Sequence, residues 1–203
     1  LTLKLLISKG VTAEKIFIQI DHNFENEAIS KGVTASFLPF INDSVVDSHY
    51  KFQLDNYWVN KHIPFYRYAV NDAKIGFREI IMNAFGKKPR VSLDDGYIPL
   101  LNTMKKGRYN LPQIVSDNNE IFNKIERLRV DNNLNIIYFT APFCENTKNI
   151  NYFDELKEKH IPSLRDYSRL FNDDSMFDGC GHLNDKGAEK FTNKIITDFY
   201  EKK

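Results

Sequence analysis

Two apolar segments of the chain have the character of strands buried in a sheet. Residues 15–21 read Lys-Ile-Phe-Ile-Gln-Ile-Asp, and residues 134–142 read Leu-Asn-Ile-Ile-Tyr-Phe-Thr-Ala-Pro. β-Branched and aromatic residues dominate both segments, and polar or turn-forming residues end them, which is typical of buried strands. Residues 160–167 predict a third, shorter strand.

Segments with helical spacing of apolar residues lie around these strands. The last of them covers residues 185–200 and carries one apolar stripe along its length. The helix predicted over residues 116–130 is expected to bury Ile121, Ile125 and Leu128. The remaining segments are helices at residues 2–9, 50–68 (broken at Pro64), 72–85 and 152–159, and an irregular excursion at residues 89–112.

Strands that alternate with helices predict a mainly parallel sheet covered by helices on both faces. We therefore expect a single α/β domain over residues 1–203, built as three layers (α/β/α), with the two main strands adjacent or one strand apart. In such sheets, functional residues gather in the loops after the carboxyl ends of the strands. The loops in question are residues 21–23, 142–144 and 173–184.

Composition narrows the possible functions. The 203 residues include 28 Lys and Arg against 27 Asp and Glu, a net charge of +1. This balance disfavours a protein that binds nucleic acid through a general positive charge. Hydrophobic residues make up 42% of the chain and aromatic residues 13%, which is typical of a globular domain. No apolar run approaches the roughly 18 residues of a membrane-spanning helix.

The segment with the clearest chemical potential is residues 177–188, Phe-Asp-Gly-Cys-Gly-His-Leu-Asn-Asp-Lys-Gly-Ala. The Asp178 carboxylate can accept a hydrogen bond from one ring N–H of His182, which leaves the other nitrogen as a general base toward a hydroxyl nucleophile. The alternative is that Asp178 closes a turn and His182 begins the helix. The other histidines lack the spacing of metal ligands, so neither a metal nor another cofactor is expected.

This segment resembles the last sequence block of the SGNH (GDSL-like) hydrolase superfamily, in which an Asp and a His precede the final helix. Residues 16–23 are similar to the strand and loop that end in Gly-x-Asn in that superfamily. The resemblance implies a flavodoxin-like sheet and a Ser-His-Asp mechanism. In that mechanism His182 would be the general base, Asp178 the acid that orients it, and Asn23 a contributor to the oxyanion hole.

The chain departs from the superfamily pattern at three points. Three residues separate Asp178 from His182 where the family usually has two, and Asp21 stands where the family has Gly. The Gly-Asp-Ser block that carries the nucleophile is absent, and no serine of the chain is assigned that role. We therefore expect the first strands and the nucleophile to lie in a segment before Leu1, or the sheet edge to pair with a partner strand. The chain alone is expected to be inactive.

The resemblance implies an esterase or O-acyltransferase that acts on an acyl ester, either a small molecule or a glycan. The alternative comes from another class: a non-catalytic relative that keeps the fold and binds a glycan or a protein partner. The acyl group, the acceptor, the choice between hydrolysis and transfer, and the oligomeric state are not specified by the sequence.

The two cysteines, Cys144 and Cys180, are too few for a disulfide scaffold. Cys144 follows a predicted strand and Cys180 lies in the loop of His182, so both belong at the carboxyl edge of the sheet. A disulfide is expected if their Cα atoms come within about 7 Å, and two independent thiols are expected otherwise. The disulfide would favour a location outside the cytoplasm or in the cell envelope.

Overall fold

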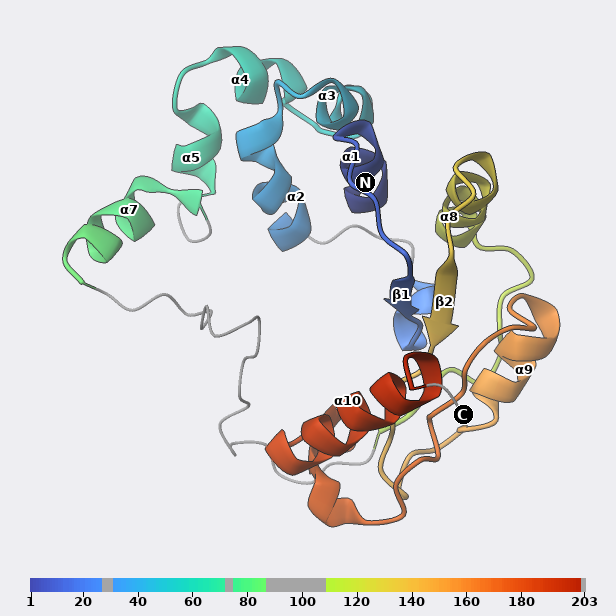
Figure 1. The fold of residues 1–203 in the computed structure, drawn as a ribbon. Coiled ribbons are helices and arrows are strands. Elements are labelled where there is room, and N and C mark those ends of the chain that lie inside the picture. Colours follow the sequence, from blue (N-terminus) through green and yellow to red (C-terminus); the bar gives the residue numbers. More distant parts are fainter. Residues whose placement is uncertain (27–30, 72–74, 87–108, 202–203) are drawn as a thin grey trace. The chain divides into compact units, whose positions relative to one another are not determined.

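The computed structural model of the chain describes residues 1–26, 31–71, 75–86 and 109–201, and it divides into two compact units (Figure 1). Within the described residues, unit 1 comprises residues 1–13, 31–71 and 75–86, and unit 2 comprises residues 14–26 and 109–201. The expectation of one domain over residues 1–203 remains a prediction, and each unit is described by itself. Residues 72–74 of one predicted helix and most of the predicted excursion at residues 89–112 lie outside the described residues.

Unit 1 is helical in its described residues. Gly10 and Gly86 follow two of its helices in the left-handed region, with φ of 71° and 80°, and glycine is favoured there because it has no Cβ. Pro64 lies in the break between two further helices, as predicted. The elements are α1 (Thr2–Ser8), α2 (Lys31–Phe37), η2 (Leu38–Phe40), α3 (Ser44–Tyr50), α4 (Tyr57–His62), α5 (Tyr66–Val70) and α7 (Phe77–Ala84).

Unit 2 contains a pair of parallel strands, β1 (Ile16–Gln19) and β2 (Ile136–Phe139). The predicted adjacency of these strands is confirmed. On the other side of β2, Phe139 forms one parallel bridge with Arg165, which is the whole contribution of the predicted third strand. The structure is therefore mixed α/β, and the described part of the chain contains small two-stranded sheets instead of one large parallel sheet.

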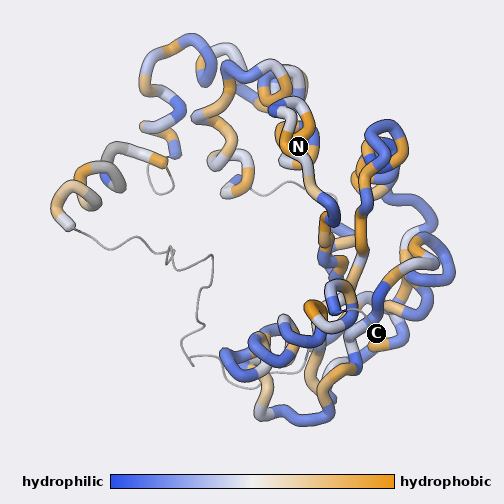
Figure 2. The backbone as a smooth tube through the Cα atoms, in the orientation of Figure 1, coloured by the Kyte–Doolittle hydropathy of each residue, from blue (hydrophilic) through white to orange (hydrophobic). Residues whose placement is uncertain are grey.

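Helices contact both faces of the β1–β2 pair. Tyr138 of β2 lies 5.5 Å, between ring centroids, from Phe122 of α8 (Glu120–Asp131). On the opposite face, Phe17 of β1 lies 5.3 Å from Phe199 of α10 (Asp185–Phe199). Successive side chains of a strand point to opposite faces, so each strand presents residues to both faces of the pair. Figure 2 shows the strands as mainly hydrophobic, as this position requires.

The buried face of α8 agrees in part with the predicted one, because Ile125 packs against the core. Ile121 is 41% exposed, whereas Phe122 is buried. The sheet-facing side also carries Glu126, which accepts a hydrogen bond from the Tyr138 hydroxyl at 2.6 Å and is held by Arg129. Periodicity assigns such charged residues to solvent, so the helical spacing did not indicate that Glu126 lies on this side.

The remaining elements of unit 2 are η1 (His22–Glu25), α9 (Tyr152–Lys159), η3 (Asp174–Met176) and the hairpin of β3 (Phe177–Gly179) with β4 (His182–Leu183). The core of the unit joins residues from strands, helices and connecting loops. Its buried members are Ile20, Phe24, Leu111, Val115, Phe122, Tyr138, Phe143, Tyr152, Phe153, Leu156, Ile161 and Leu164.

Candidate functional site

Tyr109 brings together the three loops that the sequence singled out. Its hydroxyl lies 2.6 Å from Nδ1 of His22, in the loop after β1. Its ring lies 5.4 Å, between centroids, from Phe143, in the loop after β2. The same ring packs on Gly181 of the β3–β4 turn, where an added Cβ would lie only 3.0 Å from a ring carbon. The loops therefore converge, as expected for the carboxyl edge of parallel strands.

Sequence reasoning missed Tyr109. The residue lies at the end of the predicted irregular excursion, where neither strand nor helix periodicity marks it. Burial, followed by the charge of Asp21, raises the pKa of its hydroxyl. Tyr109 is therefore a neutral hydrogen-bonding group at the centre of these loops.

The hairpin carries the predicted acid and base. Phe177 pairs with Leu183 and Gly179 with His182, so the pairing shifts at Asp178, which is left as the extra residue of a bulge. Asp178 is buried and His182 is exposed. Among the interactions of the described residues, no hydrogen bond or ion pair joins the two side chains. The structure thus places them in one hairpin without forming the acid–imidazole pair.

Several residues of the block that carries the family resemblance have packing roles. Asn184 caps α10 through its Oδ1, which accepts the Gly187 amide at 3.0 Å, and its Nδ2 donates to the Ser175 carbonyl at 2.7 Å. A Cβ at Gly187 would lie 2.2 Å from the Met176 carbonyl oxygen, so only glycine fits this contact. The block therefore fastens the hairpin to α10 independently of any chemistry.

Cys144 and Cys180 are joined by a disulfide, with their Cα atoms 4.6 Å apart. The Cys144 amide also donates to the Cys180 carbonyl at 3.0 Å. These bonds tie the loop after β2 to the turn between Asp178 and His182.

Asn23 follows His22 in η1. The backbone amide of Asn23 donates to the Asp21 carboxylate at 2.8 Å, so Asp21 acts as the N-terminal cap of η1. Asn23 and Asp21 line a cavity of about 220 Å³ beside β1 and α8, and neither Asp178 nor His182 is among the residues that line it. Within the described residues, no hydrogen bond joins Asn23 to Asp178 or His182.

The serines in the described part of the chain do not complete a triad with His182. Ser116 donates its hydroxyl to Glu25 at 2.6 Å, and Ser175 donates to Asp173 at 2.6 Å. The Ser168 hydroxyl is buried without a hydrogen-bond partner. No described serine hydroxyl bonds to His182, which agrees with assigning none of them as the nucleophile.

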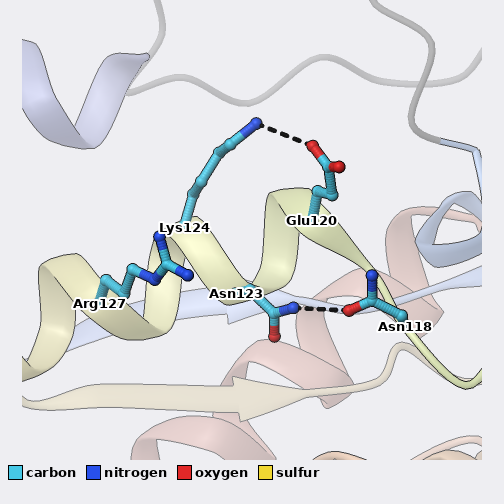
Figure 3. Close-up of a pocket in the computed structure, with 5 residues that line it drawn as sticks. All are labelled: Asn118, Glu120, Asn123, Lys124 and Arg127. Carbon is cyan, nitrogen blue, oxygen red and sulfur yellow. Dashed lines mark hydrogen bonds and ion pairs between the residues drawn. The ribbon is translucent and has the colours of Figure 1, made fainter.

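A second cavity, of about 440 Å³, lies along the solvent side of α8 (Figure 3). Lys124 pairs with Glu120 at 3.3 Å, and Asn123 donates to Asn118 at 2.7 Å. Because these side chains satisfy one another and no loop of the carboxyl edge contributes, this cavity carries no candidate site.

Comparison of the chain with protein-family models, with curated proteins and with solved structures finds no match. Across the residues that the structure describes, no group of three or more His, Cys, Asp and Glu side chains is placed to hold a metal ion. Within those same residues, no helix combines the length and apolar character needed to cross a membrane.

Proposed function

We propose that the chain supplies the acid and base of an SGNH-like esterase or O-acyltransferase. Its substrate is an acyl ester of a small molecule or of a glycan. The observation that carries the proposal is the position of the Asp178–His182 hairpin. It is fastened to α10 and, through the disulfide and Tyr109, to the loops that follow β1 and β2. The proposal includes a larger, three-layer, flavodoxin-like sheet in which β1 and β2 take part.

In this mechanism His182 removes the proton of a serine hydroxyl that the described chain does not supply. Asp178 accepts a hydrogen bond from the N–H of the other ring nitrogen and stabilises the imidazolium. Attack on the ester carbonyl forms an acyl-enzyme, and the His182 imidazolium returns its proton to the departing alcohol. Backbone amides with Asn23 stabilise the oxyanion, and water or an acceptor hydroxyl then removes the acyl group from the serine. Since no bond joins Asp178 to His182 in the structure, the exposed imidazole must turn toward the carboxylate when the site is assembled.

A second candidate function is favoured by that same missing bond. A protein that keeps the hairpin for binding alone needs no acid–imidazole pair, and an exposed His182 is then a contact residue for a glycan or a protein. This binding protein would have the same packing around Gly187 and Asn184, because those contacts serve the fold.

The test is hydrolysis of p-nitrophenyl acetate together with labelling by a fluorophosphonate, a probe that reacts with activated serines. The natural polypeptide, with whatever sequence precedes Leu1, should hydrolyse the ester and take the label. His182→Ala should abolish both, Asp178→Asn should weaken both, and His62→Ala in unit 1 should change neither.

The 203-residue chain should show no turnover above free imidazole. Turnover by this chain that His182→Ala abolishes would mean that it holds an unrecognised nucleophile. A natural polypeptide that neither turns over the ester nor takes the label would favour the binding protein.

A further inference from the structure

The aromatic ring of Tyr109 fills the space beside the turn that leads to His182. The ring lies 5.4 Å from Phe143 and 5.5 Å from His22, between ring centroids. On a third side it meets Gly181, where a Cβ would come within 3.0 Å of a ring carbon. The backbone of Gly181 has no positive φ that would itself demand glycine. The contact with the ring is therefore what keeps a side chain from this position.

Tyr109 is held both by its backbone and by its hydroxyl. Its carbonyl accepts the Lys148 amide at 2.8 Å, and the Lys148 carbonyl accepts the amide of the buried Leu111 at 3.2 Å. At the other end of the side chain, the hydroxyl lies 2.6 Å from Nδ1 of His22. A phenol hydroxyl both donates and accepts, so this bond forms with either neutral tautomer of the imidazole. The ring is thus a fixed spacer between the turn at Gly181 and the loop after β1.

We infer that Tyr109 is a positioning residue, which sets the distance between the turn of His182 and the loop of Asn23. Gly181 immediately precedes His182, and His22 immediately precedes Asn23. The disulfide ties the same turn to the loop after β2, whereas Tyr109 ties it to the loop after β1.

The inference rests on the proposed function, in which His182 takes the proton of the nucleophile and Asn23 stabilises the oxyanion. Both groups must meet one reacting ester, so their separation has to be held closely. A misplacement of about 1 Å can cost about a hundredfold in rate. Tyr109 touches neither the ester nor the nucleophile in this account and acts only through the two loops.

The first test compares two variants of the natural polypeptide, with the sequence that precedes Leu1. Tyr109→Phe keeps the ring on Gly181 and loses the bond to His22, and kcat for p-nitrophenyl acetate should fall about tenfold. Tyr109→Ala loses both contacts and should lower kcat about a hundredfold. The rate of fluorophosphonate labelling should fall in parallel, while KM changes less than about twofold, because the lost geometry acts on the transition state.

Substitutions of His22 separate the hydrogen bond from general damage to the fold. His22→Leu removes the partner of the hydroxyl and should reproduce the loss of Tyr109→Phe. His22→Asn should recover most of the rate, because its amide stands as far from the backbone as Nδ1 and both donates and accepts. The matched control is Tyr167→Phe, which loses a hydroxyl bond to Asp198 at 2.7 Å elsewhere in unit 2 and should change neither rate. Circular dichroism checks that each variant is folded.

Two further measurements test the contact with the turn. In NMR spectra of the 203-residue chain, the ring should displace the resonances of the Gly181 α-protons. This displacement should persist in Tyr109→Phe and disappear in Tyr109→Ala. In the natural polypeptide, Gly181→Ala should slow labelling, because its Cβ meets the ring. The same substitution should cost little more in the Tyr109→Ala background, since contacting residues are not additive.

The outcomes separate this inference from the proposed function. An active natural polypeptide whose rates are unchanged by Tyr109→Ala would overturn the inference and leave the proposed function standing. Undisplaced Gly181 resonances, or an equal loss of rate in Tyr167→Phe, would also overturn it. A natural polypeptide that is inactive and unlabelled, with the Gly181 resonances displaced as expected, would overturn the proposed function and with it the catalytic effect of Tyr109.

Discussion

The two units bury their apolar residues in different ways. In unit 2, a cluster of buried residues joins segments far apart in sequence, and Phe153 within it is fully buried. In unit 1, several large side chains remain in solvent, among them Phe52 at 87% exposure and Trp58. Unit 1 also has buried residues, among them Ile41 and Val46, and its helix contacts include both α4 with α5 and the distant pair α1 and α3.

Strand pairing accounts for this difference. Pairing of β1 with β2 brings together residues about 120 positions apart and creates two faces that helices cover. The described residues of unit 1 form no strand pair, and its short helices leave more of the large side chains in solvent. Aromatic content alone therefore does not predict a core, since residues 50–68 are the most aromatic part of the chain and keep Trp58 and Phe65 exposed.

The largest expected difference between the units comes from truncating one phenylalanine in each. Phe153→Ala should lower the free energy of unfolding by about 3–5 kcal/mol, because it leaves a cavity among Phe143, Tyr152 and their neighbours. Phe52→Ala should change it by less than about 0.5 kcal/mol. Urea unfolding measures both values. Trp58, the single tryptophan, reports on unit 1 by fluorescence, and hydrogen exchange of α9 reports on unit 2.

A large effect of Phe52→Ala would contradict the comparison, because it would mean that this side chain is buried in solution. Equal shifts of the two probes in Phe153→Ala would show that the units unfold together.

The disulfide is a second feature found in unit 2. Cys144 and Cys180 are 36 positions apart, and closing such a loop stabilises the folded state by about 3–4 kcal/mol in the chain-entropy account. Replacing both cysteines by serine should remove most of this stabilisation and expose the hairpin amides to exchange. Trp58 fluorescence, which follows the unfolding of unit 1, is the control. If the unfolding midpoint seen by Trp58 falls together with the protection of the hairpin amides, the two units unfold together.

Much of the local structure could be predicted from the sequence. The strand β2 and the helix α9 follow from dense β-branched residues and from clear helical spacing, and both lie within their predicted ranges. The third strand was predicted too long. Pro162 lacks an amide donor, and the described chain forms only the bridge at Arg165 there.

The site was less accessible to sequence reasoning. The positions of Asp178, His182 and Cys180 in one hairpin follow from their closeness in sequence. Tyr109 could not be found in this way, because its contacts to His22 and Gly181 join segments that only the folded chain brings together. The Asp178–His182 pairing depends on side-chain rotation and on the bulge, and neither leaves a mark in residue spacing.

Substitutions at two glycines test whether each glycine is required by close packing or by its backbone conformation. Gly187→Ala in unit 2 should destabilise the protein by about 1–3 kcal/mol, since the new Cβ collides with the Met176 carbonyl and pushes α10 from the hairpin. Gly86→Ala in unit 1 meets no neighbouring atom and should cost only about 1 kcal/mol, because its φ of 80° disfavours a side chain. Thermal unfolding compares the two. Gly86→Asn should recover part of its loss, and a similar recovery for Gly187→Asn would contradict the collision.

A small effect at neutral pH is expected from Tyr138→Phe. The lost hydrogen bond to Glu126 should cost about 1 kcal/mol, because Arg129 still holds that carboxylate.

The effect of pH on the stability of this variant is a more specific test. Burial, followed by the bond to Glu126, raises the pKa of Tyr138 far above its ordinary value. Above about pH 10 the unfolded chain therefore loses a proton that the folded chain keeps, so the free energy of unfolding falls as pH rises. Urea unfolding between neutral pH and pH 11 should show a steeper fall for the natural chain than for Tyr138→Phe. Equal slopes would mean that Tyr138 is not buried against α8.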